Sequence, residues 1–224
     1  MNRGDDMNRT ITIKGTGRVS LKPDTTVVTM TLKTCSRDYE KSMNEAAQIL
    51  ENLKSTIKKC GFDEKELKTT SFNVYTEYEG VNDRNGNYKR VFKGYCCAHT
   101  MKLEFDFDTD RLSQVLGAVS ACIAEPEMNI QFTVKDKDAA ADELLKDAAE
   151  NAKHKAEILT SSSGVKLGQL VSVDYNWGEM NLYSATECAM DRKCLSMANG
   201  AAMSFEPDDI NLSENVNFVW EICD

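Results

Sequence analysis

The sequence predicts an α+β fold, in which a mainly antiparallel sheet carries about three helices. Three observations lead to this class. Several short segments alternate apolar and polar residues, the period of a half-buried strand, and three longer segments repeat apolar residues three and four apart, the period of an amphipathic helix. The dipeptide Asn85-Gly86, between two alternating segments, is a strong signal for a hairpin turn. The elements follow one another as β-β-α-β-β-α-β-α-β-β.

The first two strands flank the stretch GTGRVSLKPD. Ile11 and Ile13 alternate with polar residues where the chain enters it, and Val28, Met30 and Leu32 share one face after it. Both patterns have the two-residue period of a strand. We therefore interpret the residues between them as the join of two neighbouring strands.

Gly15 and Gly17 raise the question of whether this join binds a phosphate. The third glycine of a dinucleotide fingerprint is missing, and a strand follows where a phosphate loop would open a helix. Without a helix N-terminus an anion lacks the row of N–H donors that would hold it. We predict instead that the glycines permit a bulge or a tight turn, and that Pro23 and Asp24 open the next strand.

Two amphipathic helices are predicted in the first half of the chain. The first covers residues 39–60; Ser36 or Asp38 can cap its start, and Gly61 suits the left-handed residue after its end. The second begins near Thr109 and ends before Pro126.

A third helix lies within residues 138–164 and has a stripe of mostly small residues: Ala141, Leu145, Ala148, Ala152, Ala156 and Leu159. Such a stripe lets the helix backbone lie close to the element that it covers. Gly164 ends the helix, and Gly168 precedes the next strand.

The remaining strands are expected at residues 72–78, 95–107, 130–134, 170–177 and 216–222. Residues 179–211 are rich in Met, Ala and Asn and have no clear period. We predict that they form a flexible insertion with some helix. Residues 1–9 are expected to be a disordered extension, and residues 10–224 a single domain.

Composition excludes several classes of function. The 41% hydrophobic and 28% charged residues are those of an ordinary globular protein. No apolar run approaches about 18 residues, so we expect no membrane insertion. A net charge of −9 argues against nucleic acid as a partner. No secretory signal is recognisable at the start of the sequence, which predicts a cytoplasmic protein.

The eight cysteines are expected to stay reduced in that compartment. There is no CxxC pair, so neither a zinc ribbon nor a thioredoxin-like motif is indicated. Cys96 and Cys97 are adjacent in a strand and point to opposite faces, so they cannot chelate one metal together. His99 is interpreted as a core or edge histidine with a backbone partner, and His154 as exposed.

No constellation of residues indicates an active site. Neither GxSxG nor HExxH is present, and the paired carboxylates lie in polar surroundings that would not raise a pKa. We therefore predict no enzyme activity, no cofactor and no metal. An alternative is a thiol-based redox role, with Cys194 activated by the preceding Arg192-Lys193 and Cys188 as its resolving partner.

The motifs taken together resemble the SIMPL-domain family. The matching features are ITIKGTGRVSLKPDTTVVTMTL, GFDEKELKTTSFNVYTEY, YKRVFKGYCCAHTMKLEFDFDTDRLSQVLGAV, NIQFTVKD, AAENAKHKAEILTSSSGVKLGQLVSV and NVNFVWEI, in this order over residues 10–222. Three departures are visible. The signal peptide of many bacterial members is missing, Thr160 replaces an alanine, and residues 206–209 replace a Pro-Gly turn.

This resemblance implies an α+β fold and a non-enzymatic role, loosely linked to stress defence or signalling. It also implies a tendency to assemble into rings, and it supplies no catalytic residue. We therefore predict a protein that acts by interaction, a homo-oligomer with an unknown protein partner, whose contact surfaces are strand edges and the long insertion. A small-molecule binder with a pocket between helices and sheet is a further alternative.

Overall fold

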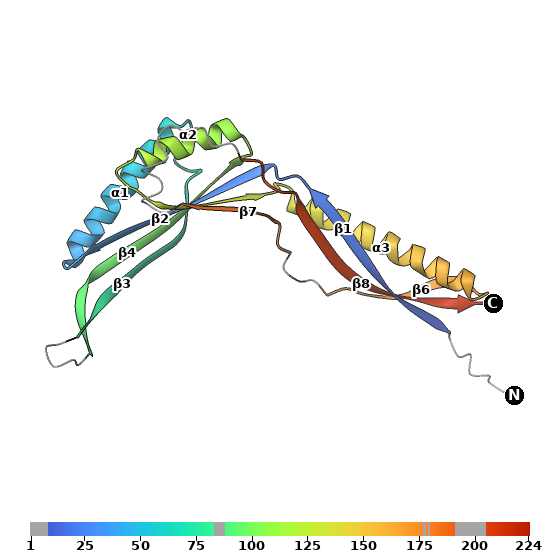
Figure 1. The fold of residues 1–224 in the computed structure, drawn as a ribbon. Coiled ribbons are helices and arrows are strands. Elements are labelled where there is room, and N and C mark those ends of the chain that lie inside the picture. Colours follow the sequence, from blue (N-terminus) through green and yellow to red (C-terminus); the bar gives the residue numbers. More distant parts are fainter. Residues whose placement is uncertain (1–8, 83–87, 177, 179, 191–204) are drawn as a thin grey trace. The chain divides into compact units, whose positions relative to one another are not determined.

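The computed structural model describes residues 9–82, 88–176, 178, 180–190 and 205–224. Within them it has three helices and eight strands (Figure 1), which confirms the predicted α+β class. The chain divides into two compact units. The first unit comprises Met1–Lys22, Val134–Ser184 and Asp208–Asp224, and the second comprises Pro23–Thr133 and Ala185–Pro207. The single domain expected over residues 10–224 stays a prediction.

The first unit holds an antiparallel sheet in the order β1-β8-β6, with one helix, α3, packed against it (Figure 1). The bounds are Thr10–Leu21 for β1, Ile210–Cys223 for β8, Lys166–Asp174 for β6 and Lys137–Ser162 for α3. Aromatic and branched side chains of the sheet meet small ones of the helix in a core formed by Ile13, Val216, Phe218, Trp220, Ala148, Ala152 and Ala156. The predicted stripe of small residues on α3 is confirmed for its four alanines, which are buried, whereas Leu145 is half-buried and Leu159, predicted to belong to the stripe, is exposed.

Gly15 and Gly17 lie inside β1, and the predicted bulge or turn at this place is wrong. The strand pairs with β8 without a register shift from its first residue to its last. A Cβ atom on Gly15 would stand 2.2 Å from the carbonyl oxygen of Ala148, and one on Gly17 would stand 2.2 Å from that of Leu144. The two glycines therefore let the backbone of α3 lie directly against the strand.

Gly164 ends α3, as predicted. Its φ is +75°, a left-handed conformation that suits glycine. The N–H groups of Gly164 and Val165 donate to the carbonyl oxygens of Ser161 at 3.2 Å and Thr160 at 3.0 Å, which is the bond pattern of a Schellman motif. Thr160 is buried and donates its hydroxyl to the carbonyl oxygen of Ala156 at 2.8 Å.

Gly168 occupies an irregular position in β6. The register with β8 shifts between Leu167 and Leu170. A Cβ atom on Gly168 would stand 2.8 Å from the Cβ of Glu221 on β8. The irregular pairing that the sequence predicts for the first strand is absent there, and β6 has a register shift at this glycine.

The second unit is built on a five-stranded sheet in the order β3-β4-β2-β5-β7, covered on one face by α1 and α2 (Figure 1). The strands are β2 Thr25–Ser36, β3 Lys68–Asn82, β4 Tyr88–Asp106, β5 Glu127–Thr133 and β7 Tyr183–Met190, and the helices are α1 Tyr39–Lys59 and α2 Thr109–Ser120. The core between the layers consists of large side chains, among them the fully buried Met30, Leu53, Leu103 and Phe132.

Local signals in this unit behave as predicted. Asp38 caps α1 by accepting a hydrogen bond from the N–H of Lys41 at 2.9 Å, and Gly61 follows the helix with a φ of +87°. Strand β2 begins directly after Pro23 and Asp24. The backbone of Asp24 bonds to residues at the ends of β4 and β5. Its carbonyl oxygen accepts a hydrogen bond from the N–H of Phe107 at 2.7 Å, and its own N–H donates to the carbonyl oxygen of Thr133 at 3.1 Å.

The prediction for residues 179–211 is wrong in part. Tyr183–Met190 form β7 at one edge of the five-stranded sheet, where the sequence predicts a flexible segment with some helix. Strand β8 begins at Ile210, ahead of the predicted start. Residues 191–204 of the predicted insertion, like residues 1–8 of the predicted extension, lie outside the described residues. In the described chain, no helix has the length and apolar character needed to cross a bilayer.

Candidate functional site

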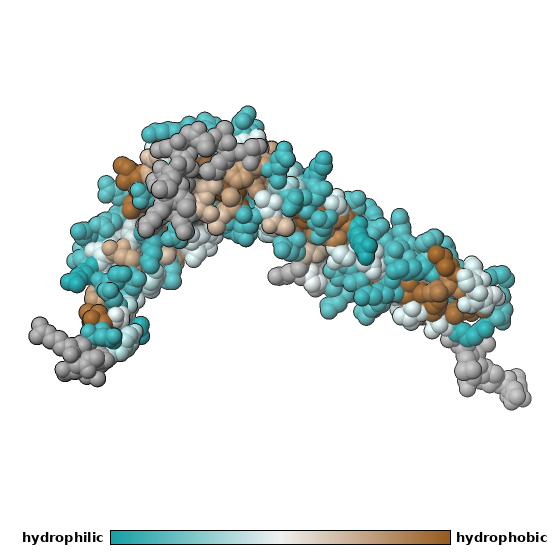
Figure 2. Space-filling view, in the orientation of Figure 1, coloured by the Kyte–Doolittle hydropathy of each residue, from teal (hydrophilic) through white to brown (hydrophobic). Residues whose placement is uncertain are grey.

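One edge of the three-stranded sheet carries exposed apolar side chains. Among the described strands β6 has β8 as its neighbour on one side and none on the other. Leu170, Val171 and Val173 are 51%, 50% and 48% exposed, on both faces of the strand. Ile158 and Leu159, near the end of α3, are exposed as well. We call these five residues the β6 surface; Figure 2 shows apolar side chains gathered at this end of the first unit.

The opposite edge, on β1, is covered. Three side chains one turn apart on α3 bond to its outward-facing backbone groups: Asp147 to the N–H of Arg18 at 2.7 Å, Asn151 to the N–H of Thr16 at 3.0 Å, and Lys155 to the carbonyl of Lys14 at 3.1 Å. A strand edge with satisfied N–H and C=O groups offers no template for another strand. The two edges of this sheet therefore differ in their capacity to pair.

A second exposed surface lies on the β3–β4 hairpin. Strand β2 pairs with β4 from Tyr95 onward, so residues 77–82 and 88–94 form a two-stranded ribbon, which we call the hairpin arm. Its exposed large side chains are Tyr78, Val81, Tyr88, Val91 and Phe92. A two-stranded ribbon is marginally stable alone, and the arm is therefore a natural contact surface. The predicted Asn85-Gly86 turn falls outside the described residues.

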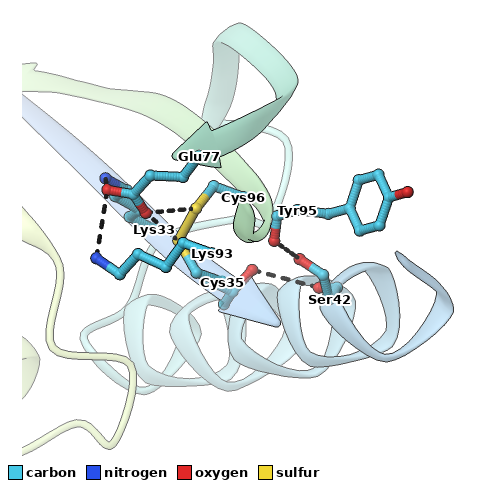
Figure 3. Close-up of a disulfide and its surroundings, with 8 residues drawn as sticks. Lys33, Cys35, Ser42, Glu77, Lys93, Tyr95 and Cys96 are labelled. Atoms are coloured by element: carbon cyan, nitrogen blue, oxygen red, sulfur yellow. Dashed lines mark hydrogen bonds and ion pairs between the residues drawn. A yellow bond between two sulfur atoms is a disulfide. The ribbon is translucent and has the colours of Figure 1, made fainter. Parts of the chain in front are cut away.

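The second unit also contains a disulfide between Cys35 and Cys96 (Figure 3). The two residues stand directly opposite each other on β2 and β4. Cys35 is exposed, whereas Cys96 is fully buried. The prediction that the cysteines stay reduced is wrong for this pair.

A carboxylate lies against both sulfur atoms. Oε2 of Glu77, on β3, is 3.0 Å from Sγ of Cys96 and 3.6 Å from Sγ of Cys35. Its other oxygen faces two ammonium groups, Lys93 at 3.5 Å and Lys33 at 3.9 Å (Figure 3). Glu77 lies where the register between β3 and β4 shifts, and such irregularities re-aim side chains.

Lys33 has a second partner on this sheet face, the phenol of Tyr75. The pKa of Lys33 is raised, chiefly by a hydrogen bond with the phenol of Tyr75 and further by the negative charge of Glu77. Lys33 and Cys35 are two residues apart on β2 and therefore share a face. Lys33, Lys93 and Glu77 together carry one net positive charge beside the exposed Cys35, and the charge of Glu127 acts on Lys33 as well, more weakly than that of Glu77.

The local backbone fixes the strands around the disulfide. A Cβ atom on Gly94 would stand 2.5 Å from the carbonyl oxygen of Ser36, so glycine allows β4 to approach the end of β2. The hydroxyl of Ser42, on α1, donates to the carbonyl oxygen of Tyr95 at 3.0 Å (Figure 3). These contacts fix the backbone next to each cysteine, at Ser36 and Tyr95, near the start of α1.

This cluster is also the one group of potential metal ligands found among the described residues, with the three ligand atoms within 4.8 Å of one another. While the disulfide is closed, the sulfur atoms are not thiolates. Opened by reduction, two thiolates and a carboxylate would suit Zn²⁺. The sequence missed this site because its parts come from three strands, and no spacing in the chain marks them.

The other cysteines do not form a site in the described residues. Burial raises the pKa of Cys60 and Cys97, which disfavours the reactive thiolate form. Cys188 is half-buried on β7 and packs against the core of the second unit. Cys194 lies outside the described residues, so the proposed Cys188–Cys194 pairing stays a prediction.

The two histidines lie where the sequence predicts them, but the partner of His99 differs from the prediction. His99 is buried, and its Nε2 is 2.8 Å from the hydroxyl of Thr69 rather than from a backbone group. Burial lowers its pKa, and the charge of Lys54 lowers it further. His154 is exposed, as predicted.

A hollow of about 420 Å³ lies beside β2, β5 and β7. Thr29 and Thr31 line it, and they alternate with core residues of β2, so the hollow is on the face away from α1 and α2. Asn129 donates to Glu187 there at 2.6 Å, and its Oδ1 has no partner within the described chain. The predicted pocket between helices and sheet is a different place and stays a prediction.

Comparisons with known proteins place these features in a family. The SIMPL family model, described as "Protein of unknown function (DUF541)", matches residues 11–220. The uncharacterized protein YggE of Edwardsiella ictaluri is 24% identical over 219 residues, which are 95% of this chain and 86% of YggE. A 26 kDa periplasmic immunogenic protein of Brucella melitensis is 20% identical over 163 residues, 73% of this chain and 65% of that protein. A protein of the same name from Brucella abortus is 19% identical over 163 residues.

Proposed function

Because the chain belongs to the SIMPL family, we propose that it acts without catalysis, by binding copies of itself through the free edge of β6. The observation that carries this proposal is the exposure of Leu170, Val171 and Val173 on an edge strand. A second strand laid along β6 would satisfy its outward N–H and C=O groups and cover these side chains.

The contrast with β1 supports a directed association. Because Asp147 and Asn151 occupy the N–H groups of β1, strand addition has one edge of this sheet to use. Pairing of β6 with β6 would close as a dimer, whereas pairing of β6 with the hairpin arm would be heterologous and could continue into a ring. The ring assembly implied by the family resemblance corresponds to the second case.

The cellular role is also a proposal. The family resemblance favours a part in stress defence or signalling. The sequence predicts a cytoplasmic protein, but the Cys35–Cys96 disulfide and the periplasmic name of the Brucella relatives support an oxidising compartment instead. Cell fractionation after expression of the natural gene with a detectable tag would decide between the cytoplasm and an oxidising compartment.

The mass in solution tests the assembly. We expect size-exclusion chromatography with light scattering at micromolar concentration to give a multiple of 25.0 kDa. The double variant Val171→Lys with Val173→Lys should shift the mass toward the monomer, because lysine on an edge strand opposes pairing. Ile123→Lys is the matched control, since Ile123 is 85% exposed outside any strand. A monomeric native protein, or equal effects of both changes, would contradict the proposal.

A further inference from the structure

We propose that the Cys35–Cys96 pair is a thiol–disulfide exchange centre, which reacts stoichiometrically with a small anionic thiol of the glutathione type. This activity is independent of self-association. Three observations carry it: the unequal exposure of the two cysteines, the carboxylate in contact with both sulfurs, and the two lysines beside them.

The unequal exposure assigns a separate role to each cysteine. An external thiolate must approach a disulfide along the S–S axis and needs an accessible sulfur. Cys35 is exposed and Cys96 is not, so attack occurs at Sγ of Cys35. Cys96 is then the sulfur that leaves.

The reaction balances with two equivalents of thiol. A first thiolate forms a bond to Sγ of Cys35, the Cys35–Cys96 bond breaks, and its electron pair stays on Cys96, which takes up a proton. A second thiolate attacks the external sulfur of the mixed disulfide and releases Cys35 as a thiolate, which also takes up a proton. The protein disulfide is reduced by two electrons, and two small thiols become one small disulfide. The reverse direction oxidises the dithiol.

Glu77 favours the open, reduced state. Its carboxylate is 3.0 Å from Sγ of Cys96 and 3.6 Å from Sγ of Cys35. A thiol can donate a hydrogen bond to this carboxylate, whereas a disulfide has no proton to donate. Hydrogen bonds to an ionised acceptor are the stronger kind. Glu77 therefore shifts the equilibrium with external thiols toward the dithiol.

The lysines set the preference for an anionic thiol. Lys33 and Lys93 hold the second oxygen of Glu77 and leave the cluster with one net positive charge. A small thiol with a negative charge is attracted to the exposed sulfur, and a cationic one is repelled.

A disulfide that served as a structural staple would not need this arrangement. Strands β2 and β4 are already paired along the whole length of β2, from Thr25 opposite Asp106 to Ser36 opposite Tyr95. A staple also gains nothing from an exposed sulfur or from a carboxylate that can accept a proton from the opened pair.

The first experiment follows the site of attack in the native protein. Oxidised full-length protein is treated with reduced glutathione, quenched with acid and analysed by peptide mapping. We expect the mixed disulfide on Cys35, at least about tenfold above that on Cys96. Equal labelling of the two cysteines, or a disulfide that stays closed at millimolar glutathione, would overturn the proposal. Because the native sequence is used, the result does not depend on a variant that folds poorly.

The second experiment tests Glu77. In glutathione redox buffers at pH 6.5, where thiols are protonated, Glu77→Gln should lower the equilibrium ratio of dithiol to disulfide about tenfold, since a charge-assisted hydrogen bond is lost. Glu79→Gln is the matched control: Glu79 is exposed on the same strand, and we expect no change. If both variants behave like the native protein, the role of Glu77 is wrong.

The third experiment tests the lysines. Glutathione should open the native disulfide faster than cysteamine, which is cationic, after correction for the thiolate fraction of each reagent. The difference should shrink with added salt and in the variant Lys33→Gln with Lys93→Gln. A faster reaction with cysteamine would contradict the preference for anionic thiols.

Discussion

The two units of the protein pack a helix on a sheet in opposite ways. In the first unit α3 meets β1 where the strand has glycine, and a Cβ atom on Gly15 would stand 2.2 Å from a helix carbonyl. In the second unit α1 and α2 are held above the sheet by fully buried large side chains, among them Leu53 and Phe132. One contact depends on the absence of side chains, and the other depends on their volume.

This difference has consequences at the sheet edges. Because the backbone of α3 lies against β1, its polar side chains Asp147 and Asn151 reach the outward N–H groups of that strand. In the second unit the helices lie on one face of the sheet, and the opposite face carries Glu77 and Cys35. The close packing of α3 thus covers the edge of the three-stranded sheet at β1. In the five-stranded sheet the helices cover one face only, and the disulfide cluster lies on the other face.

The largest expected effect is the loss of core volume in the second unit. Phe132 is fully buried and packs edge-on against Phe107, with ring centres 5.4 Å apart. We expect Phe132→Ala to lower the free energy of unfolding by about 4 kcal/mol, from lost transfer energy and the cavity that remains. Urea unfolding followed by circular dichroism measures it. Phe72→Ala, at a residue that is 52% exposed, should cost under about 1 kcal/mol; equal losses would refute the contrast.

A smaller loss is expected when volume is added to the first unit. Gly15→Ala places a methyl group against the backbone of Ala148, so helix and strand must move apart, at a cost of about 3 kcal/mol. The matched change is Gly117→Ala in α2, where nothing lies within 4 Å of the new atom; it should stabilise by about 0.5 to 1 kcal/mol. If Gly15→Ala is neutral in urea unfolding, the close contact described for α3 is not required.

The cover over β1 gives a third, weaker prediction. Asn151→Ala removes the acceptor for the N–H of Thr16, and an orphaned backbone donor costs about 1 to 2 kcal/mol. The uncovered edge should also raise the apparent mass in light scattering. Glu150→Ala, at an exposed neighbouring position on α3, should change neither quantity. An unchanged Asn151→Ala variant would show that β1 does not depend on this cover.

Much of the fold could be predicted because its signals are local. Asp38 before α1, Gly61 and Gly164 after two helices, and the two-residue and three-to-four-residue periods of the chain each depend on a few neighbouring residues. Strand β7 lacked such a signal: its burial alternates, but the inward Ser184 and Thr186 are polar and the outward Ala185 is apolar.

The role of Gly15 and Gly17 could not be predicted, because a bulge and a close approach both require glycine in a strand. The approach depends on Ala148, more than a hundred residues away in the sequence. The same limit applies to the disulfide. Cys35 and Cys96 are 61 residues apart, and they meet because β2 lies beside β4, a sheet order that no local pattern specifies. The sequence therefore singled out Cys188 and Cys194 by their neighbours along the chain.

The smallest expected effect is a pH dependence confined to the second unit. Burial lowers the pKa of His99 in the folded protein, so below about pH 6.5, the ordinary value for histidine, the unfolded chain binds more protons than the folded one. The free energy of unfolding should be level above pH 6.5 and should fall as the pH drops from there through the folded pKa. His99→Gln should reduce this slope, whereas His154→Gln, at an exposed position, should not. Urea midpoints between pH 7.5 and 5 measure the effect. If the free energy of unfolding of His99→Gln falls with pH as steeply as that of the native protein, another group is titrating. The surroundings of His99 in the second unit would then tolerate a charged imidazole.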